Sequence, residues 1–156
     1  MDAQLDTLSH QVGEWLDARN AKLACAESCT GGWVAEAVTA TAGSSAWFDC
    51  GFVTYSNEAK RDLLGVSPDT LRNCGAVSEE TVREMVTGTL ARSRAELALA
   101  ISGVAGPAGG TPAKPVGMVC FAWGRRGGKL RSETRHFVGD REAVRRQAVI
   151  DRKSVV

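Results

Sequence analysis

LACAESCTGGWVAEAVTA, residues 23–40, is the stretch from which we predict the fold class. Its first four residues form a short apolar run with the length of a buried strand. Gly31 and Gly32 then permit a tight turn, and residues 33–40 have the alanine, valine and glutamate content of a helix. The stretch therefore predicts a strand, a glycine turn and a helix, with Ser28 placed just after the strand.

The flanking sequence continues the alternation of helices and strands. Helices are expected at residues 3–20, 57–64, 68–73, from Ser78 to about Arg94, and from about Arg141 to the chain end, which cuts the last one short. Ser56 and Gly65 are placed to begin and end the helix at 57–64. Strands are expected at residues 48–55, 97–101, 116–123 and 130–137, the last two as a hairpin around Gly127-Gly128. This order predicts a single three-layer α/β/α domain over residues 1–156, with a mixed, mostly parallel sheet.

The composition is that of one ordinary globular domain. Of its 156 residues, 44% are apolar and 24% are charged. Nineteen basic and eighteen acidic residues leave a formal net charge of +1, so no overall field favours nucleic acid or a membrane as a partner. The amino terminus lacks the pattern of a secretion signal, and no stretch approaches the roughly 18 apolar residues of a membrane helix. We therefore expect a cytoplasmic protein.

The cysteines predict neither disulfides nor a metal centre. There are five of them, an odd number scattered through apolar runs, at Cys25, Cys29, Cys50, Cys74 and Cys120. A small secreted domain would instead carry a paired framework, so reduced thiols are expected. No cysteine pair has the close spacing of a structural zinc site, and no histidine pair accompanies them.

Ser28 is the first candidate for catalysis. A serine between a strand and a helix, followed by Thr30, Gly31 and Gly32, can present its hydroxyl beside free backbone N–H groups that stabilise an oxyanion. Such a setting suits a nucleophile. The local sequence alone favours a plainer role, in which Ser28 caps the helix and the glycines permit the turn.

A serine nucleophile needs a base, and Lys60 is the best candidate. The two histidines, His10 in the first helix and His136 in a late strand, lie away from the predicted turns. Lys60 falls in the first turns of the helix after Tyr55, where the helix dipole and burial would both lower the pKa of its ammonium group. A neutral lysine can accept a proton from serine. The more common fate of such a lysine is a solvated surface position.

Cys29 is an alternative nucleophile at the same turn. It lies near the start of a predicted helix, which would lower the pKa of its thiol. A cysteine amidase of this kind would lose activity on treatment with a thiol alkylating agent, whereas a serine enzyme would lose activity only through steric blockage. We favour the serine.

Two features could bind an anionic group of a substrate. The glycine-rich loop at 102–110 could bring backbone N–H groups close to a phosphate, although it matches neither the P-loop nor the dinucleotide-binding fingerprint. Arg141 and Arg145 share one face of the last helix and could form a fork for phosphate or carboxylate. Ion pairs with Asp140 and Glu142 would explain these arginines equally well.

Four motifs together resemble the CinA carboxy-terminal domain family. They are AESCTGG (26–32), GFVTYSNEAK (51–60), GAVSEE (75–80) and SGVAGPAGGTPAKPVG (102–117), in the order and spacing of the family. The similarity extends from about residue 20 to about residue 145. It implies a nicotinamide-nucleotide amidase, which converts nicotinamide mononucleotide to nicotinate mononucleotide and ammonia in pyridine nucleotide salvage. It also implies a homodimer that needs no metal or organic cofactor.

The resemblance carries roles onto particular residues. It implies a serine–lysine hydrolase in which Ser28 is the nucleophile, Lys60 is the base and Tyr55 is a supporting tyrosine. Our hypothesis is that Tyr55 orients Lys60 or shares its proton. On this hypothesis the N–H groups of Thr30 and Gly31 hold the oxyanion. The residues expected to bind the substrate are Thr30, Gly31, Gly32, Ser102, Gly103, Gly106 and Arg145. The phosphate anchor is either the glycine loop or the arginine of this set.

The sequence departs from the family at two places. Ser102 stands where threonine is more common, a change that keeps the hydroxyl. The terminal residues 153–156 look unlike a finished helix, so carboxy-terminal packing or assembly is expected to differ. The larger amino-terminal domain of some members is also missing, which predicts a stand-alone version.

A function from another class is the alternative. The chain would then be a non-catalytic nucleotide-binding or protein-interaction module in a competence or DNA-damage response, because fold alone does not decide function. Such a module would bind a nucleotide without releasing ammonia. It would also tolerate Lys60→Ala, whereas the enzyme would not.

Overall fold

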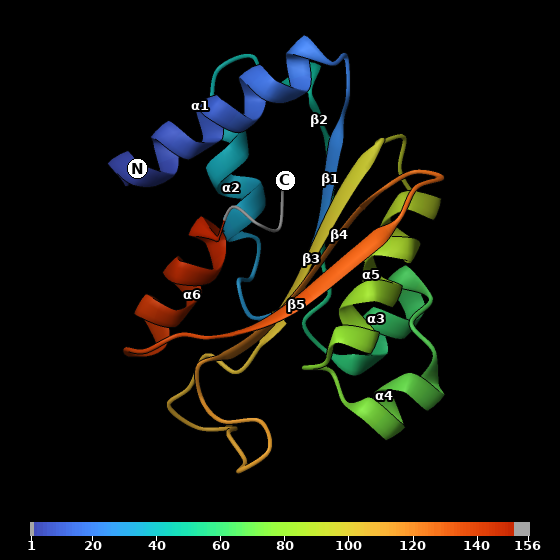
Figure 1. The fold of residues 1–156 in the computed structure, drawn as a ribbon, viewed down its shortest axis with the longest axis vertical. Coiled ribbons are helices and arrows are strands. Elements are labelled where there is room, and N and C mark those ends of the chain that lie inside the picture. Colours follow the sequence, from blue (N-terminus) through green and yellow to red (C-terminus); the bar gives the residue numbers. More distant parts are fainter. Residues whose placement is uncertain (1, 152–156) are drawn as a thin grey trace.

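The computed structural model describes residues 2–151 and contains one five-stranded sheet flanked by helices (Figure 1). The strands are β1 (Leu23–Glu27), β2 (Phe48–Val53), β3 (Leu97–Gly103), β4 (Met118–Arg125) and β5 (Leu130–His136). The helices are α1 (Ala3–Ala18), α2 (Trp33–Thr39), α3 (Asn57–Leu64), α4 (Pro68–Cys74), α5 (Glu79–Ala91) and α6 (Arg141–Ile150), with a short 3-10 helix at Ser44–Ala46. The predicted strands and the first five predicted helices are confirmed.

The sheet has the strand order β2-β1-β3-β4-β5. β1 pairs in parallel with β2 and β3, whereas β3 with β4 and β4 with β5 are antiparallel. The predicted mixed sheet is confirmed. Two of its pairings are parallel and two are antiparallel among the described residues, and β1, β2, β3 and β5 run in the same direction. β4 is reversed because the loop at 104–117 returns the chain directly alongside β3, and the predicted hairpin then restores the first direction in β5.

Helices cover both faces of the sheet, with α1, α2 and α6 on one face and α3, α4 and α5 on the other (Figure 1). Two apolar cores result, and β1 contributes to each of them by alternation. Leu23 and Cys25 pack into the core that includes residues of α2 and α6, and Ala26 packs into the core that includes residues of α5. Because both of its faces are covered, β1 is buried along its whole length, which explains its apolar sequence.

Capping residues fix the ends of α3, the helix that carries Lys60. Ser56 Oγ accepts the Ala59 N–H at 3.0 Å, and Gly65 ends the helix in the left-handed region at φ 71°. Both ends agree with the prediction. Lys60 is therefore held in the first turn of α3, close to the carboxyl end of β2.

The last helix differs from the prediction at its carboxyl end. α6 ends at Ile150, and the Asp151 N–H donates to Gln147 O at 3.0 Å. The helix therefore ends before the chain does and is not cut short by it. The expectation for residues 153–156 lies outside the described residues. Within residues 2–151 no helix is long and apolar enough to span a membrane.

Candidate active site

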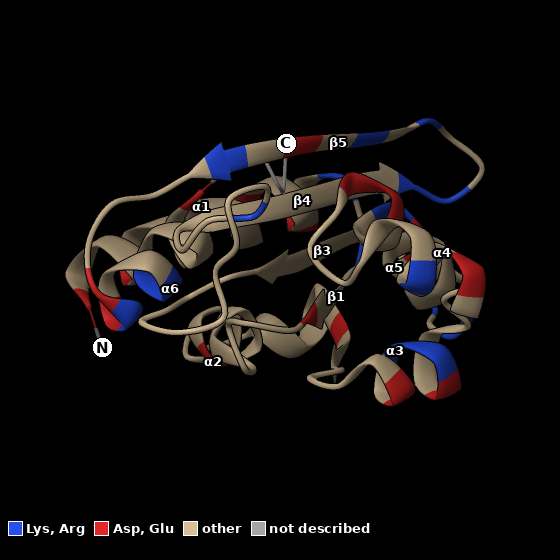
Figure 2. Cartoon of the chain, turned by 90° about the horizontal axis from the view of Figure 1, so that it is seen from below, with Lys and Arg blue, Asp and Glu red and all other residues tan. Residues whose placement is uncertain are grey.

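Three segments meet at one end of the sheet, as the sequence predicts. The carboxyl ends of β1, β2 and β3 lead into the Ser28 turn, the junction at 55–60 and the glycine loop, and Figure 2 looks onto this end. Between these segments lies a cavity of about 310 Å³. Of the predicted site residues, those that line it are Ser28, Tyr55, Lys60, Ser102, Gly103 and Gly106. Thr30, Gly31, Gly32 and Arg145 do not line it.

Ser28 and Lys60 are in direct contact in this cavity. Lys60 Nζ lies 2.8 Å from Ser28 Oγ, and the exposed fractions of the two residues are 0% and 8%. Ser28 is held in place because its N–H donates to Ile101 O on β3 at 3.0 Å. It does not cap α2, whose N-cap residue is Gly32. A hydroxyl and an amine at this distance can exchange a proton.

Lys60 is surrounded by main-chain carbonyls rather than by carboxylates. Its Nζ donates to Thr54 O at 2.7 Å and to Tyr55 O at 3.2 Å. Among the described residues no Asp or Glu forms an ion pair with it. Burial lowers the pKa of the Lys60 ammonium from 10.5 to about 8, and the negative charge of a Cys29 thiolate would raise this pKa. In its neutral form the amine would keep two N–H bonds to the carbonyls and direct its lone pair at Ser28.

Tyr55 contributes to the pair through its main chain. Its carbonyl accepts the hydrogen bond from Lys60 and also lies 3.5 Å from Ser28 Oγ. Its side chain is 62% exposed, and the phenol oxygen accepts a hydrogen bond from Arg141 Nη2 at 3.1 Å. Tyr55 therefore contacts Lys60 through its main-chain carbonyl, whereas its phenol is bonded to Arg141 on α6.

The turn after Ser28 leaves different N–H groups free from those predicted. The Gly31 N–H donates to Ser28 O at 3.0 Å, so it is already occupied. The Trp33 N–H is bonded to Thr30 O in the same way. Within residues 2–151 the N–H groups of Cys29, Thr30 and Gly32 donate to no other residue. The predicted oxyanion pair therefore loses Gly31, and of the three free donors only Cys29 belongs to a residue that lines the cavity.

A buried carboxylate that the sequence analysis did not single out holds this turn. Glu27, the last residue of β1, accepts a hydrogen bond from Thr30 Oγ1 at 2.6 Å. The N–H groups of Val34 and Ala35 donate to the same carboxylate at 2.9 and 3.1 Å. Thr30, which we expected to bind substrate, is fully buried and uses its hydroxyl here. A charged residue that ends an otherwise apolar strand is the signal that could have identified Glu27.

The two arginines of α6 that were expected to form a fork lie at different parts of the site. Arg145 lies against the Ser28 turn, where its Nε donates to Cys29 O at 3.0 Å and its Nη2 to Thr30 O at 3.3 Å. Two of the Arg145 donors are therefore taken by the backbone of the turn, and this residue does not line the cavity. Arg141, one turn earlier, lines the cavity and donates to Gly106 O at 2.8 Å.

The predicted site glycines are required by backbone geometry. Gly31 and Gly32 have φ values of 61° and 102°, a region that glycine adopts readily. A Cβ on Gly103 would lie 2.7 Å from a methyl group of Val119 on β4. These glycines therefore shape the turn and the cavity wall. Ser102, beside them on β3, is buried and lines the cavity.

Cys29 is poorly placed as a nucleophile. It is 7% exposed, and burial raises the pKa of its thiol to about 11. The start of α2 does not lower this pKa as the sequence suggested, so the thiol stays protonated near neutral pH. His10 on α1 and His136 at the end of β5 lie outside the cavity. The described residues contain no group of three His, Cys, Asp or Glu that could hold a metal ion.

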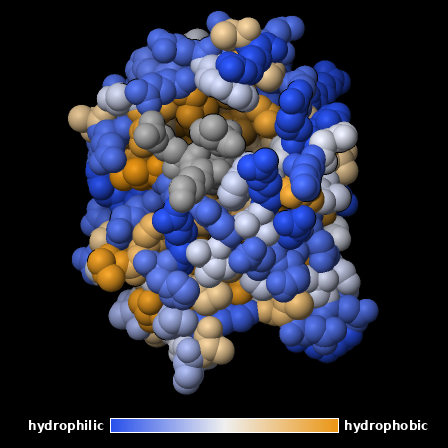
Figure 3. All heavy atoms as spheres, viewed as in Figure 1, coloured by the Kyte–Doolittle hydropathy of each residue, from blue (hydrophilic) through white to orange (hydrophobic). Residues whose placement is uncertain are grey.

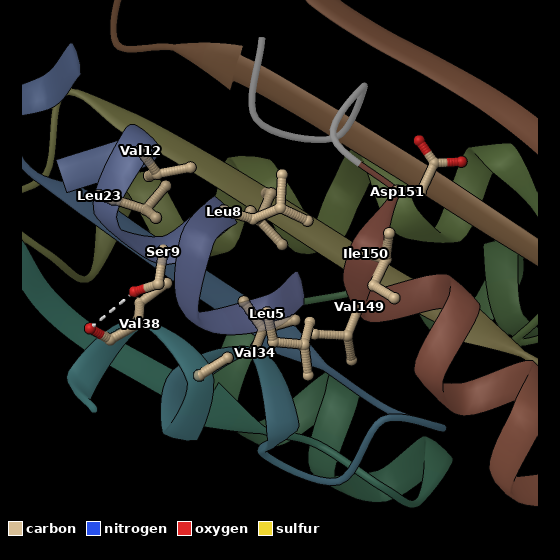
Figure 4. A pocket seen from close by; sticks show the side chains of 12 residues that line it. Leu5, Leu8, Ser9, Val12, Leu23, Val34, Val38, Val149, Ile150 and Asp151 are labelled. Carbon is tan, nitrogen blue, oxygen red and sulfur yellow. Dashed lines mark hydrogen bonds between the residues drawn. The ribbon is translucent and has the colours of Figure 1, made fainter. Parts of the chain in front are cut away.

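A smaller cavity between α1, α2 and α6 offers little chemistry. It measures about 50 Å³ and is lined mainly by leucine, valine and isoleucine side chains (Figure 4). Its hydroxyl, Ser9 Oγ, is bonded to Val38 O at 3.3 Å and to Thr41 Oγ1 at 2.5 Å. Its carboxylate, Asp151, forms an ion pair with Arg135.

The surface on this side of the molecule is mostly hydrophilic, and Figure 3 shows some apolar residues exposed beside α1.

Comparison with known proteins gives the family. The family model of the CinA C-terminal domain matches residues 5–151. The chain belongs to the CinA C-terminal domain family. Within this family, the nicotinamide-nucleotide amidohydrolase PncC of Escherichia coli strain K12 is 56% identical over 147 residues, which cover 94% of this chain and 89% of that protein. PncC of Pseudomonas putida is 56% identical over 146 residues, which cover 94% and 91%.

Solved structures of CinA proteins have the same fold. The competence/damage inducible protein of Agrobacterium tumefaciens superposes with a TM-score of 0.94 at 41% identity, covering 99% of this chain and 93% of that one. A CinA superfamily protein of Escherichia coli gives 0.92 at 36% identity, covering 99% and 89%. The resemblance that the four motifs predicted is therefore confirmed, and so is the three-layer α/β/α arrangement.

Proposed function

We propose that this chain is a nicotinamide-nucleotide amidohydrolase, which hydrolyses the carboxamide of nicotinamide mononucleotide to nicotinate mononucleotide and ammonia. Relatives that are 56% identical over 94% of the chain carry this activity in their names. The observation that carries the proposal is the 2.8 Å contact between Lys60 Nζ and Ser28 Oγ in the wall of a cavity. A buried lysine without a carboxylate partner, beside a serine, suits hydrolysis through an acyl-enzyme.

The first half of the reaction forms the acyl-enzyme. Neutral Lys60 accepts the proton of Ser28 Oγ, which attacks the carboxamide carbon. The carbonyl oxygen becomes an oxyanion and accepts a hydrogen bond from the free N–H group of Cys29, which lines the cavity. The tetrahedral intermediate collapses, the C–N bond breaks, and protonated Lys60 gives its proton to the departing ammonia.

The second half releases the acid. Lys60, neutral again, removes a proton from a water molecule that attacks the ester carbon. The bond to Ser28 Oγ then breaks, and the proton on Lys60 returns to the serine. Thr54 O and Tyr55 O hold the amine in both halves, because each accepts one of its N–H groups.

Arg141 is the proposed anchor for the substrate phosphate. It lines the cavity, and two hydrogen bonds, to Gly106 O and the Tyr55 hydroxyl, fix its guanidinium group. In the described part of the chain it forms no ion pair with Asp140, Glu142 or any other carboxylate. A positioned and uncompensated guanidinium suits a phosphate, which it can bind with its remaining donors.

Product analysis tests the proposal. Purified protein is incubated with nicotinamide mononucleotide, without added metal, and ammonia and nicotinate mononucleotide are quantified against Ser28→Ala. The proposal predicts equal amounts of both products from the wild type and none from the variant. Calorimetric binding of the nucleotide by folded wild-type protein, with no product, would instead support the non-catalytic binding module.

The cellular setting is part of the same proposal. We place the enzyme in the cytoplasm as a homodimer that acts on a pyridine nucleotide in salvage, in keeping with the family resemblance. Sedimentation equilibrium of the full chain gives the oligomeric state, and a mass of 16.5 kDa at all concentrations would reject the dimer.

A further inference from the structure

Glu27 is a buried carboxylate next to Ser28 in the chain, and the proposed reaction does not use it. It is 1% exposed. A carboxylate in such a place is costly unless donors surround it. Besides the Thr30 hydroxyl and the N–H groups of Val34 and Ala35, the Cys25 thiol donates to it at 3.7 Å. No lysine or arginine pairs with it among the described residues.

These donors come from both sides of Ser28 in the chain. Cys25 precedes it on β1, Thr30 belongs to the turn itself, and Val34 and Ala35 belong to the first turn of α2. The N-cap residue of α2 is Gly32, which has no side chain to accept those N–H groups. Glu27, at the end of the preceding strand, therefore accepts the N–H groups that an N-cap side chain usually accepts. These hydrogen bonds connect the end of β1 to the start of α2, on either side of Ser28.

The same contacts decide which N–H groups remain free. The Val34 and Ala35 N–H groups are taken by Glu27, and the Trp33 N–H is taken by Thr30 O. Among the described residues, the N–H groups of Cys29, Thr30 and Gly32 remain without an acceptor, and of these residues Cys29 lines the cavity. Their direction depends on the backbone of the turn, which the Thr30–Glu27 bond holds.

We infer that Glu27 is a positioning residue for the nucleophile, which holds the Ser28 turn so that the serine stays in reach of Lys60 and the Cys29 N–H group meets the oxyanion. This inference rests on the proposed function. A reacting group displaced by about 1 Å can lose about a hundredfold in rate without loss of binding. Glu27 should therefore affect turnover and leave substrate affinity nearly unchanged.

The test is Glu27→Gln, compared with Glu36→Gln as a matched control. Glutamine has the same shape, but its NH₂ group cannot accept the hydrogen bonds that one carboxylate oxygen accepts. Glu36 is an exposed carboxylate in the first turn of the same helix. The readouts are kcat, KM, the pH profile, the circular dichroism spectrum, and the labelling rate of Ser28 by a fluorophosphonate.

We expect Glu27→Gln to stay folded and to lose at least about tenfold in kcat, with KM changed by less than about threefold. Labelling of Ser28 should slow by a similar factor, and the pKa in the pH profile should stay that of the wild type. Glu36→Gln should match the wild type in all of these measurements. A folded Glu27→Gln variant with a lower melting temperature but wild-type kcat and labelling would overturn the inference.

Thr30 provides a second route if Glu27→Gln does not fold. Thr30→Val removes the hydroxyl that bonds to Glu27 at nearly the same volume, and Thr39→Val makes the same change at an exposed threonine of α2. The inference predicts that Thr30→Val loses kcat and labelling and that Thr39→Val retains both, whereas full activity of a folded Thr30→Val variant would overturn it. A wild-type protein that neither releases ammonia nor takes the label would overturn the proposed function, and this inference with it.

Discussion

Lys60 determines the pH dependence expected of the enzyme. Burial lowers the pKa of its ammonium to about 8, and below that pH the charged form cannot accept the Ser28 proton. We expect kcat/KM to rise about tenfold per pH unit below about pH 8 and to level off above it, as the neutral amine becomes the main form. Initial rates from about pH 6 to about pH 10 measure this. A flat profile would contradict the role of Lys60 as base.

Lys60→Arg is the matched variant for this pH series. Arginine keeps the positive charge and hydrogen-bond donors but does not lose its proton in proteins. We expect it to be inactive at every pH at which the wild type works. Recovery of activity at high pH would show that the titrating group lies elsewhere.

Cys29 is expected to be dispensable as a nucleophile. Its thiol is buried and has a pKa of about 11, so very little thiolate is present near neutral pH. Cys29→Ala should keep turnover within about threefold of the wild type, because the Cys29 N–H that we assign to the oxyanion belongs to the backbone. Loss of all ammonia release in a folded variant would instead support the cysteine mechanism.

Residue identities could be predicted from the sequence where local context carried the information. Ser28 follows a strand and Lys60 lies in the first turn of a helix, and both positions can be recognised from the order of residues. Glu27 and Arg141 were missed or undervalued because their roles depend on partners that only the fold supplies. The Glu27 side chain is buried because helices cover both faces of β1. The packing of α6 places Arg141, and not Arg145, in the cavity wall.

At the scale of elements, α6 connects to the site through two arginines with different functions. Arg141→Ala should weaken binding of nicotinamide mononucleotide by about 10- to 100-fold, the equivalent of about 1.5–3 kcal/mol for charge-assisted hydrogen bonds. Binding of nicotinamide riboside, which lacks the phosphate, should change by less than about threefold.

Calorimetric dissociation constants for the two ligands measure this difference. Arg146→Ala is the control on the same helix, because Arg146 pairs with Asp2 away from the cavity. Arg145→Ala should lower kcat for the mononucleotide without affecting the discrimination between ligands, since its donors hold Cys29 O and Thr30 O. Equal weakening of both ligands by Arg141→Ala would reject Arg141 as the phosphate anchor.

The contact of α3 with α5 depends on a glycine. A Cβ on Gly88 in α5 would collide with the main-chain carbonyl of Leu64, the last residue of the helix that carries Lys60. Gly88→Ala should destabilise the fold by about 1–3 kcal/mol, although alanine is the better helix former. Urea unfolding measures the change, with the exposed neighbour Thr87→Ala as control. An unchanged or higher unfolding midpoint would show that the two helices can separate at no cost.

Elements with local start and stop signals could be predicted most closely. α3 begins after Ser56 and ends before Gly65 in both sequence and structure, because capping needs only neighbouring residues. α5 was expected to reach about Arg94 and ends at Ala91, where no glycine or proline marks the boundary. The helix at 68–74 also has its own cap, Ser67.

At the scale of the whole molecule, the strand order brings the site together. β2, β1 and β3 are adjacent and parallel, so the segments that follow them converge at one end of the sheet. This convergence could be predicted, because it follows from alternating strands and helices. The balance of parallel and antiparallel pairings could not, since it depends on where the loop at 104–117 places β4.

The central claim is that Ser28 and Lys60 together hydrolyse the carboxamide. The most direct measurement is ammonia release from nicotinamide mononucleotide by the wild type and by Lys60→Ala, with equal folding of the two shown by circular dichroism. We predict steady release by the wild type and a loss of at least about a thousandfold in kcat for the variant, consistent with removal of a general base. Wild-type turnover by folded Lys60→Ala would contradict the account.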